Sequence, residues 1–162
     1  MHTVRVGQGV DVHPFSDDPA RALVLGGVPF PGERGLAGHS DADVIAHAVT
    51  DALLGAAGLG DIGQHFPDTD PALAGADSLE LLRLVVADVR AAGWEPGNVD
   101  CTVVLDAPRL APHRDEVQAK LTAAVGAPVT VKGKRTEGVG ALGRGEGIVC
   151  FAVAVLTREG PA

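Results

Sequence analysis

Cysteine is scarce in this sequence: the only two are Cys101 and Cys150, and each lies within an apolar segment. This pattern argues against a disulfide framework and favours a cytoplasmic protein with two buried thiols. Long apolar runs are also absent, since no segment approaches the roughly 20 residues that cross a bilayer. The opening MHTVRVGQGVDV has neither the apolar core nor the cleavage pattern of a signal peptide. The sequence therefore predicts neither a membrane span nor export.

Positive charge is in short supply as well, because 13 lysines and arginines face 21 aspartates and glutamates, for a formal net charge of -8. Such a chain repels polyanions, which argues against nucleic acids and anionic membranes as partners. A phosphate ester as ligand would need metal ions, backbone N–H groups or a few well-placed cations. With 162 residues, of which 46% are hydrophobic, the chain is long enough for a well-packed core, and we expect a single domain over 1–162.

Alternating hydrophobic periods predict strands and helices. The expected strands span 3–11, 23–30, 99–105, 129–136 and 148–156, and the expected helices span 40–57, 78–92 and 112–125. This order is typical of an α/β (α+β) two-layer sandwich, in which helices cover one face of a mixed β-sheet. The segment IVCFAVAVL (148–156) is apolar at every position, so we expect a central strand that is covered on both faces.

Three segments without periodicity interrupt this pattern: 60–77, 106–115 and 137–147. The first is longer than most loops in compact domains, which favours a binding or lid role. Loops on a rigid scaffold often hold functional residues, so we expect these segments to build the ligand site.

Histidine and aspartate are concentrated in GHSDADVIAH (38–47). Ser40 followed by Asp43 is typical of a capping box at the start of a helix, and His47 would then lie on the second turn. Asp43, His47 and Asp51 are spaced i, i+4 and i+8, so they share one helix face. An exposed face with an ordinary Asp–His pair is one interpretation of this stripe, and a functional site is the other.

Asp11 and His13 lie two positions apart at the end of the first expected strand, so both side chains point to one face of the sheet. Together with one histidine from a neighbouring helix they would supply two imidazoles and one carboxylate. This set suits a zinc site whose fourth position is open for catalysis. An Asp-x-His pair also occurs often by chance, so the spacing alone leaves a purely structural role open.

Four motifs span most of the chain: GVDVHPF (9–15), HSDADVIAHAVTDALLGAAGLGDIGQHFPDTDP (39–71), NVDCTVVLDAPRLAPH (98–113) and TEGVGALGRGEG (136–147). In this order they resemble the 2-C-methyl-D-erythritol 2,4-cyclodiphosphate synthase family of the non-mevalonate isoprenoid pathway. The resemblance implies a homotrimeric phosphorus-oxygen lyase with active sites at the subunit interfaces. Each site would convert 4-diphosphocytidyl-2-C-methyl-D-erythritol 2-phosphate to the cyclic diphosphate by metal-dependent phosphoryl transfer, with release of CMP.

By the same resemblance, Asp11, His13 and His47 match zinc ligands, and Glu137 matches the carboxylate that holds a second ion, magnesium or manganese. His39 matches a residue that steadies the transition state. The positions that match substrate contacts are Ser40, Asp61, Ile62, Gly63, Phe66, Pro67, Asp68, Thr69, Asp70, Leu105, Asp106, Ala107, Pro108, Arg109, Leu110, Ala111, Lys134, Thr136, Ala141 and Arg144.

Lys134 and Arg135 depart from the family pattern, in which small hydroxyl residues precede the glutamate; only Thr136 retains a hydroxyl here. Because one replaced hydroxyl is a transition-state contact in the family, Arg135 becomes a candidate catalytic residue. Ala141 stands where an aromatic residue is common, which would widen the pocket. Two other functions stay open: a zinc phosphohydrolase that uses the same three ligands with an activated water, and a non-catalytic trimer that binds isoprenoid phosphates along an axis lined by apolar side chains.

Overall fold

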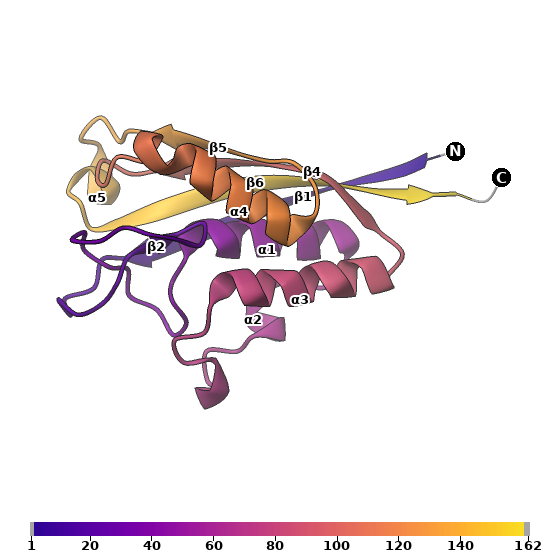
Figure 1. Ribbon diagram of the computed structural model, residues 1–162, viewed down its shortest axis with the longest axis horizontal. Coiled ribbons are helices and arrows are strands. Elements are labelled where there is room, and N and C mark those ends of the chain that lie inside the picture. Colours follow the sequence, from indigo (N-terminus) through magenta and orange to yellow (C-terminus); the bar gives the residue numbers. More distant parts are fainter. Residues whose placement is uncertain (1, 161–162) are drawn as a thin grey trace.

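The computed structural model describes residues 2–160, which form a four-stranded sheet with helices packed against it (Figure 1). The elements, in chain order, are β1 (His2–Pro14), β2 (Val24–Leu25), β3 (Val28–Pro29), α1 (Val44–Ala57), α2 (Ile62–His65), η1 (Pro71–Leu73), α3 (Ser78–Ala91), β4 (Glu95–Val104), η2 (Ala111–His113), α4 (Arg114–Val125), β5 (Val129–Lys134), α5 (Gly140–Gly143) and β6 (Gly147–Glu159). The sheet order is β1-β6-β4-β5. Of its neighbouring strands, β4 and β5 run parallel and the other pairs run antiparallel, so the sheet is mixed, as predicted.

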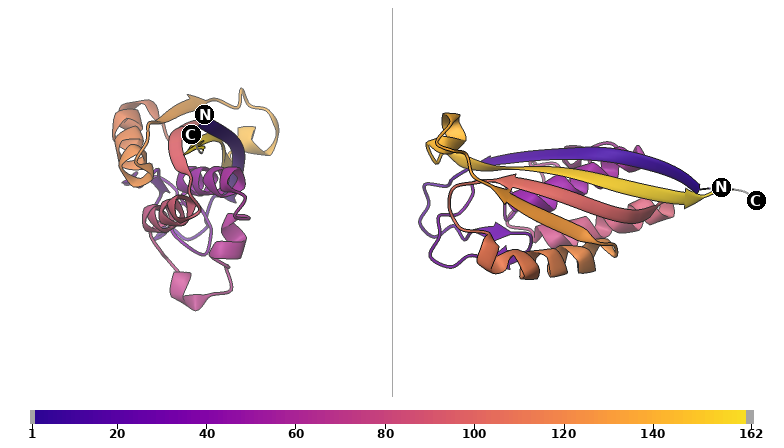
Figure 2. Two further views of the ribbon diagram at one scale, coloured as in Figure 1. Left: turned by 90° about the vertical axis from the view of Figure 1, so that its right-hand side faces the viewer. Right: turned by 90° about the horizontal axis from the view of Figure 1, so that it is seen from above.

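The helices α1, α3 and α4 lie on one side of this sheet, which confirms the predicted two-layer sandwich (Figures 1 and 2). Helix α1 packs directly against β1 and β6. Strands β1, β4 and β5 all end at the same edge of the sheet, on the left in Figure 1. Among residues 2–160, no helix combines the length and the apolar character needed to cross a membrane.

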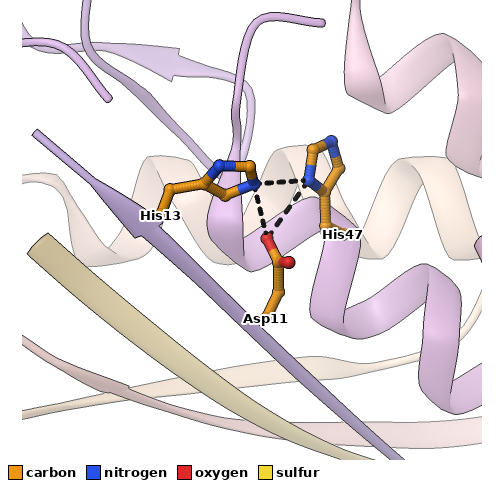
Figure 3. A group of neighbouring side chains, drawn as sticks. All are labelled: Asp11, His13 and His47. Carbon is orange, nitrogen blue, oxygen red and sulfur yellow. Dashed lines mark hydrogen bonds and ion pairs between the residues drawn. The ribbon is translucent and has the colours of Figure 1, made fainter. Parts of the chain in front are cut away.

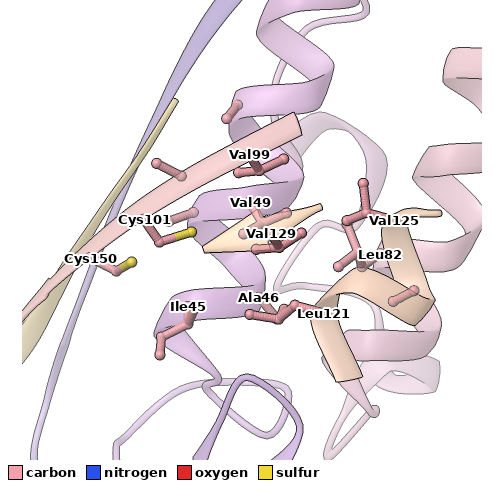
Figure 4. Close-up of a cluster of buried hydrophobic side chains, with 14 of the residues drawn as sticks. Ile45, Ala46, Val49, Leu82, Val99, Cys101, Leu121, Val125, Val129 and Cys150 are labelled. Atoms are coloured by element: carbon pink, nitrogen blue, oxygen red, sulfur yellow. The ribbon is translucent and has the colours of Figure 1, made fainter. Parts of the chain in front are cut away.

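Buried side chains between the sheet and the helices form the core. Figure 4 shows Val49 of α1 near Cys101 of β4 and Val129 of β5, with Leu82 of α3 and Leu121 of α4 on the helical side. The two thiols are both buried and unpaired, as predicted.

Strand β6 is central, between β1 and β4, but the prediction that both of its faces are covered is wrong. Phe151 and Val153 are 41% and 42% exposed, while Ala152 between them is fully buried. Because every long helix lies on the other side, the second face of the sheet has no cover from within residues 2–160. This outer apolar face consists of Val4, Val6, Val10, Val12, Phe151 and Val153, all at least 41% exposed.

Helix α1 begins at Val44, and its N-cap lies three residues later than the capping-box interpretation predicted. Its N-cap is Asp43 and not Ser40: one carboxylate oxygen of Asp43 accepts hydrogen bonds from the N–H groups of Ile45 and Ala46, both at 3.1 Å. Aspartate is among the strongest N-cap residues, since its oxygen satisfies N–H groups that have no partner within the helix.

The expected strand over 23–30 is divided into a short hairpin, β2 and β3, that turns at Gly26 and Gly27. Both glycines have positive φ angles, 58° and 74°, which a two-residue hairpin turn requires and which glycine adopts without strain. Their N–H groups donate to the buried carboxylate of Asp43 at 2.8 and 2.6 Å. This hairpin is thereby tied to the start of α1.

Candidate metal centre and adjoining cavities

Asp11, His13 and His47 bring one potential ligand atom each to a common point, where the end of β1 lies beside α1 (Figure 3). Asp11 Oδ2 lies 3.0 Å from His13 Nε2 and 3.2 Å from His47 Nδ1, and the two ring nitrogens are 3.2 Å apart. Among the side chains that the structure describes, this is the one such group of three or more.

Local geometry explains why the three side chains meet. Alternation along β1 turns Asp11 and His13 toward α1, on the same face as Gly9. Gly9 has no side chain to hold α1 away: a Cβ atom there would lie only 2.0 Å from the carbonyl oxygen of Ala48. His47, the residue before Ala48, therefore reaches the end of the strand.

Electrostatics around the triad favour a cation. His13 Nδ1 lies 2.7 Å from the carbonyl oxygen of Ala37, which can only accept, so Nδ1 carries the proton and neutral His13 presents a lone pair at Nε2. Burial lowers the pKa of His13, but the hydrogen bond and charge of Asp11 outweigh it and raise this pKa above its usual value. Burial raises the pKa of Asp11, yet hydrogen bonds with His13 and His47 hold it well below its usual range.

The donor set fits zinc. Ligand atoms about 2.0–2.1 Å from a tetrahedral zinc ion lie roughly 3.3 Å apart, close to the 3.0–3.2 Å separations in the triad. The second nitrogen of each ring is also engaged: that of His13 by Ala37, and that of His47 by the hydroxyls of Ser78 at 2.8 Å and Ser40 at 3.2 Å. Such outer contacts orient histidine ligands in metal sites.

A cavity of about 440 Å³ opens beside the triad. The expected functional residues in its wall, besides the triad, are His39, Ser40, Ile62, Gly63, Phe66, Pro67 and Asp68. Two further expected residues, Asp61 and Asp70, make hydrogen bonds that stabilise the loops around this cavity. Asp61 caps α2, and the carbonyl oxygen of Asp70 lies 2.6 Å from His39 Nε2, so the 60–77 segment is joined to the loop before α1.

A second cavity, of about 410 Å³, lies where β4 and β5 end. Its wall contains the expected residues Leu105, Asp106, Pro108, Arg109, Leu110, Ala111, Lys134 and Arg135. Ala107 and Arg144 line a neighbouring hollow of about 360 Å³. None of these residues borders the cavity beside the triad. The expected substrate contacts are thus divided between separate hollows of one chain.

Comparison with known proteins gives the family. The model of the YgbB family matches residues 4–157. The chain belongs to the YgbB family. Relatives include 2-C-methyl-D-erythritol 2,4-cyclodiphosphate synthase of Bordetella petrii, 59% identical over 157 residues, which are 95% of this chain and 96% of the relative. The protein of that name from Aromatoleum aromaticum is 59% identical over 159 residues, 96% of this chain and 95% of the relative.

Solved structures share the YgbB-family fold. The CDP complex of IspF from Plasmodium falciparum is 31% identical, with a TM-score of 0.83 and 97% of each chain covered. The bifunctional IspDF from Campylobacter jejuni is 38% identical, with a TM-score of 0.92 over 98% of this chain. The match covers 43% of that bifunctional chain, so the present chain corresponds to less than half of it.

Some residues expected from the family lie apart from the triad. Glu137 is exposed, has a positive φ of 54°, and is not part of the ligand group. Thr136 donates its N–H and its hydroxyl to the Asp106 carboxylate, and these hydrogen bonds hold the pKa of Asp106 below its usual value. Arg135 Nε lies 3.8 Å from the same carboxylate. The expected site residues outside the walls of all three hollows are Asp61, Thr69, Asp70, Thr136, Glu137 and Ala141.

The polar stripe of Asp43, His47 and Asp51 is neither an exposed face nor a functional site over its whole length. Asp43 is fully buried and holds the hairpin and the N-terminus of α1, so it is structural. Asp51 accepts a hydrogen bond from the N–H of Ile62, which fixes the start of α2. Ser78, by contrast, contacts His47 and was missed in the sequence. Its 31-residue separation from His47 offers no periodic signal, and its place at a helix start is explained by capping alone.

Proposed function

We propose that this YgbB-family chain is a 2-C-methyl-D-erythritol 2,4-cyclodiphosphate synthase of the non-mevalonate isoprenoid pathway. It would convert 4-diphosphocytidyl-2-C-methyl-D-erythritol 2-phosphate to the cyclic diphosphate and CMP. The observation that supports this most strongly is the convergence of Asp11, His13 and His47 at the wall of a cavity, in a chain 59% identical to a relative of that name.

The proposed reaction is an intramolecular phosphoryl transfer. An oxygen of the 2-phosphate attacks the β-phosphorus of the diphosphate, the bond from that phosphorus to the bridging oxygen breaks, and CMP leaves. A phosphate monoester has a second pKa of roughly 6 and is mostly dianionic at neutral pH, so no general base is needed. The barrier is the approach of two anions, which positioning and cationic screening lower.

The residues around the triad have distinct proposed roles. Asp11, His13 and His47 hold a zinc ion, which when bound polarises the transferring phosphoryl group and screens its charge. His39 borders the cavity and contacts the phosphates, in a loop that its hydrogen bond to Asp70 steadies. Glu137 would hold a second ion, magnesium or manganese, because magnesium is commonly bound by one or two carboxylates and substrate phosphates.

The cytidine half of the substrate is proposed to bind at 105–111. Two solved relatives are described with CDP bound, which supports a nucleotide pocket in this fold. Lys134 and Arg135 border the same cavity, and the Arg135 side chain is 79% exposed. We assign to one of these cations a charge-assisted contact with the leaving phosphate, in place of the hydroxyl contacts of the family.

A homotrimer would complete the site, because the hollow beside the triad and the hollow at 105–111 share no wall residue on one chain. The outer apolar face supports such an assembly. Its six exposed apolar side chains lie on two adjacent strands, and apolar patches of this kind mark association surfaces. The proposed partners are a small CDP-linked substrate and further copies of this chain. Neither nucleic acid nor a membrane is a proposed partner, and the proposed location is the cytoplasm.

Product analysis tests this function. The purified protein is incubated with the substrate, zinc and magnesium, and the products are followed by phosphorus-31 NMR. Equal amounts of cyclic diphosphate and CMP are expected. Release of inorganic phosphate or a free alcohol would indicate a zinc phosphohydrolase, and ligand binding without turnover would indicate a non-catalytic isoprenoid-phosphate binding trimer. Either result would overturn the proposal.

A further inference from the structure

Ser78, at the first turn of α3, lies between His47 and a carboxylate. Its hydroxyl oxygen is 2.8 Å from His47 Nε2, and the hydroxyl also hydrogen-bonds to Asp41 Oδ1. The backbone N–H of Ser78 donates to Asp41 Oδ2 at 3.0 Å. Ser78 is only 1% exposed, so water does not compete freely for these contacts. Asp41, Ser78 and His47 therefore form a continuous hydrogen-bonded chain that ends at the metal centre.

The direction of each hydrogen bond in this chain follows from what the groups can donate. An ionised carboxylate only accepts, so the single hydroxyl proton of Ser78 points to Asp41. The oxygen of Ser78 is then left as an acceptor for His47, and Nε2 of His47 must carry the proton. A neutral imidazole protonated at Nε2 has its lone pair at Nδ1, which is the atom that lies 3.2 Å from both Asp11 Oδ2 and His13 Nε2.

We propose that Ser78 and Asp41 are positioning residues that select the His47 tautomer with a free Nδ1 and orient the ring for metal binding. This inference rests on the proposed metal site and names residues that act on it from outside the ligand set. Ser40 lies farther from His47 Nε2, at 3.2 Å, and its hydroxyl has no carboxylate to set its direction among the contacts of its side chain. The tautomer is thus set by Ser78.

The hydrogen-bonded residues Asp41, Ser78 and His47 also connect the metal centre to the 60–77 loop. Ser78 follows this loop directly, and Asp41 also donates its backbone N–H to Ala76 at 3.1 Å. A second backbone bond joins Gly75 N–H to the carbonyl oxygen of His39 at 2.9 Å. The 60–77 loop, which borders the cavity, is therefore anchored by the residues that orient His47. The position of this loop and the orientation of the His47 ring depend on the same contacts.

Zinc affinity without substrate tests this role. Wild-type protein, Ser78→Ala and Asp41→Asn are titrated with zinc against a chromophoric chelator. We expect Ser78→Ala to weaken zinc binding about 10- to 100-fold, the usual effect of losing an outer partner of a histidine ligand. The matched control is Thr50→Val, which removes a buried hydroxyl from α1, the helix that carries His47. This hydroxyl bonds to the carbonyl oxygen of Ala46, so the zinc affinity of the variant should be that of the wild type.

Asp41→Asn keeps the size and shape of the side chain and changes its hydrogen bonding. An amide nitrogen that faces Ser78 Oγ also replaces the oxygen that accepts the backbone N–H of Asp43 at 3.1 Å, so the position of the ring proton must be measured directly. The amide N–H can donate to Ser78, whose proton then turns to His47 Nε2 and moves the ring proton to Nδ1. Nitrogen-15 NMR of zinc-free protein, at a pH where His47 is neutral, should show protonated Nε2 in the wild type and a shift toward protonated Nδ1 in Asp41→Asn. Zinc affinity should fall in parallel, with an unchanged circular dichroism spectrum.

Unchanged zinc affinity in both Ser78→Ala and Asp41→Asn, or a wild-type His47 protonated at Nδ1, would overturn the inference. These readouts need no turnover, so they are independent of the reaction. Zinc affinities and a His47 tautomer as predicted, without any formation of cyclic diphosphate, would contradict the proposed function and leave the tautomer inference intact.

Discussion

Gly9→Ala offers a sharp test of how the strand and the helix build the metal centre. The new Cβ atom would lie 2.0 Å from the carbonyl oxygen of Ala48 and 2.7 Å from the backbone nitrogen of Ala52. Non-bonded carbon and oxygen atoms are normally at least about 3.3 Å apart. Helix α1 would therefore have to move away from β1 by roughly 1.3 Å. His47 lies on the moving helix, whereas Asp11 and His13 stay on the strand.

Gly9→Ala should change both the stability of the protein and its affinity for zinc. Overpacking of this kind lowers the free energy of unfolding by about 1–3 kcal/mol. Metal–ligand distances tolerate deviations of only about 0.2 Å, so the displacement of His47 should also weaken zinc binding. Gly55→Ala is the matched control on α1: its Cβ would meet only the carbonyl oxygen of Gln8 at 3.8 Å, an ordinary contact. Replacing this exposed helical glycine should stabilise the protein by about 0.5–1 kcal/mol.

The assays are urea unfolding of zinc-free protein, at one protein concentration for all variants, and chelator competition for zinc. We expect Gly9→Ala to lose both stability and zinc affinity, and Gly55→Ala to gain stability with unchanged zinc affinity. If Gly9→Ala binds zinc as tightly as the wild type, close packing of α1 on β1 does not set the geometry of the triad, and this reasoning is refuted.

Three further predictions concern the ligands, the assembly and the cations. His13→Ala should lose most of about one zinc per chain, measured by metal analysis; full occupancy would contradict the ligand set. Val6→Asp on the outer apolar face should shift the proposed trimer toward monomers in light scattering, whereas Leu84→Asp, at an exposed position of α3, should not. A fully active wild-type monomer would refute the proposed assembly. Lys134→Ala or Arg135→Ala should lower turnover roughly ten- to a thousandfold with little change in substrate binding; wild-type rates in both would exclude a role for these cations.

Elements whose signals are local were predictable from the sequence. The spacing of Asp11 and His13 placed both on one face of a strand, and the start of α3 at Ser78 follows from the capping residue Asp77 and the apolar period. Both depend on backbone periodicity and on the nearest few residues. Pairing the strand ligands with His47 required the family resemblance as well as the helix pattern.

Features that depend on tertiary contacts were not predictable. Asp43 is buried where Gly26 and Gly27, 17 and 16 residues earlier, point their N–H groups at it, and no local pattern specifies that approach. The segment 148–156 of β6 is apolar at every position, which does not distinguish cover by helices of the same chain from cover by another chain. The contact between Ser78 and His47 likewise arises only when α3 packs beside α1.

The origin of the oxygen atoms in the product tests the central claim most directly. The reaction is run in water enriched in oxygen-18, with zinc and magnesium, and the products are analysed by mass spectrometry. Attack by the 2-phosphate of the same molecule predicts a cyclic diphosphate and CMP without any oxygen from solvent. One solvent oxygen in an acyclic phosphate product, with no cyclic diphosphate formed, would show that water is the nucleophile and would contradict the account.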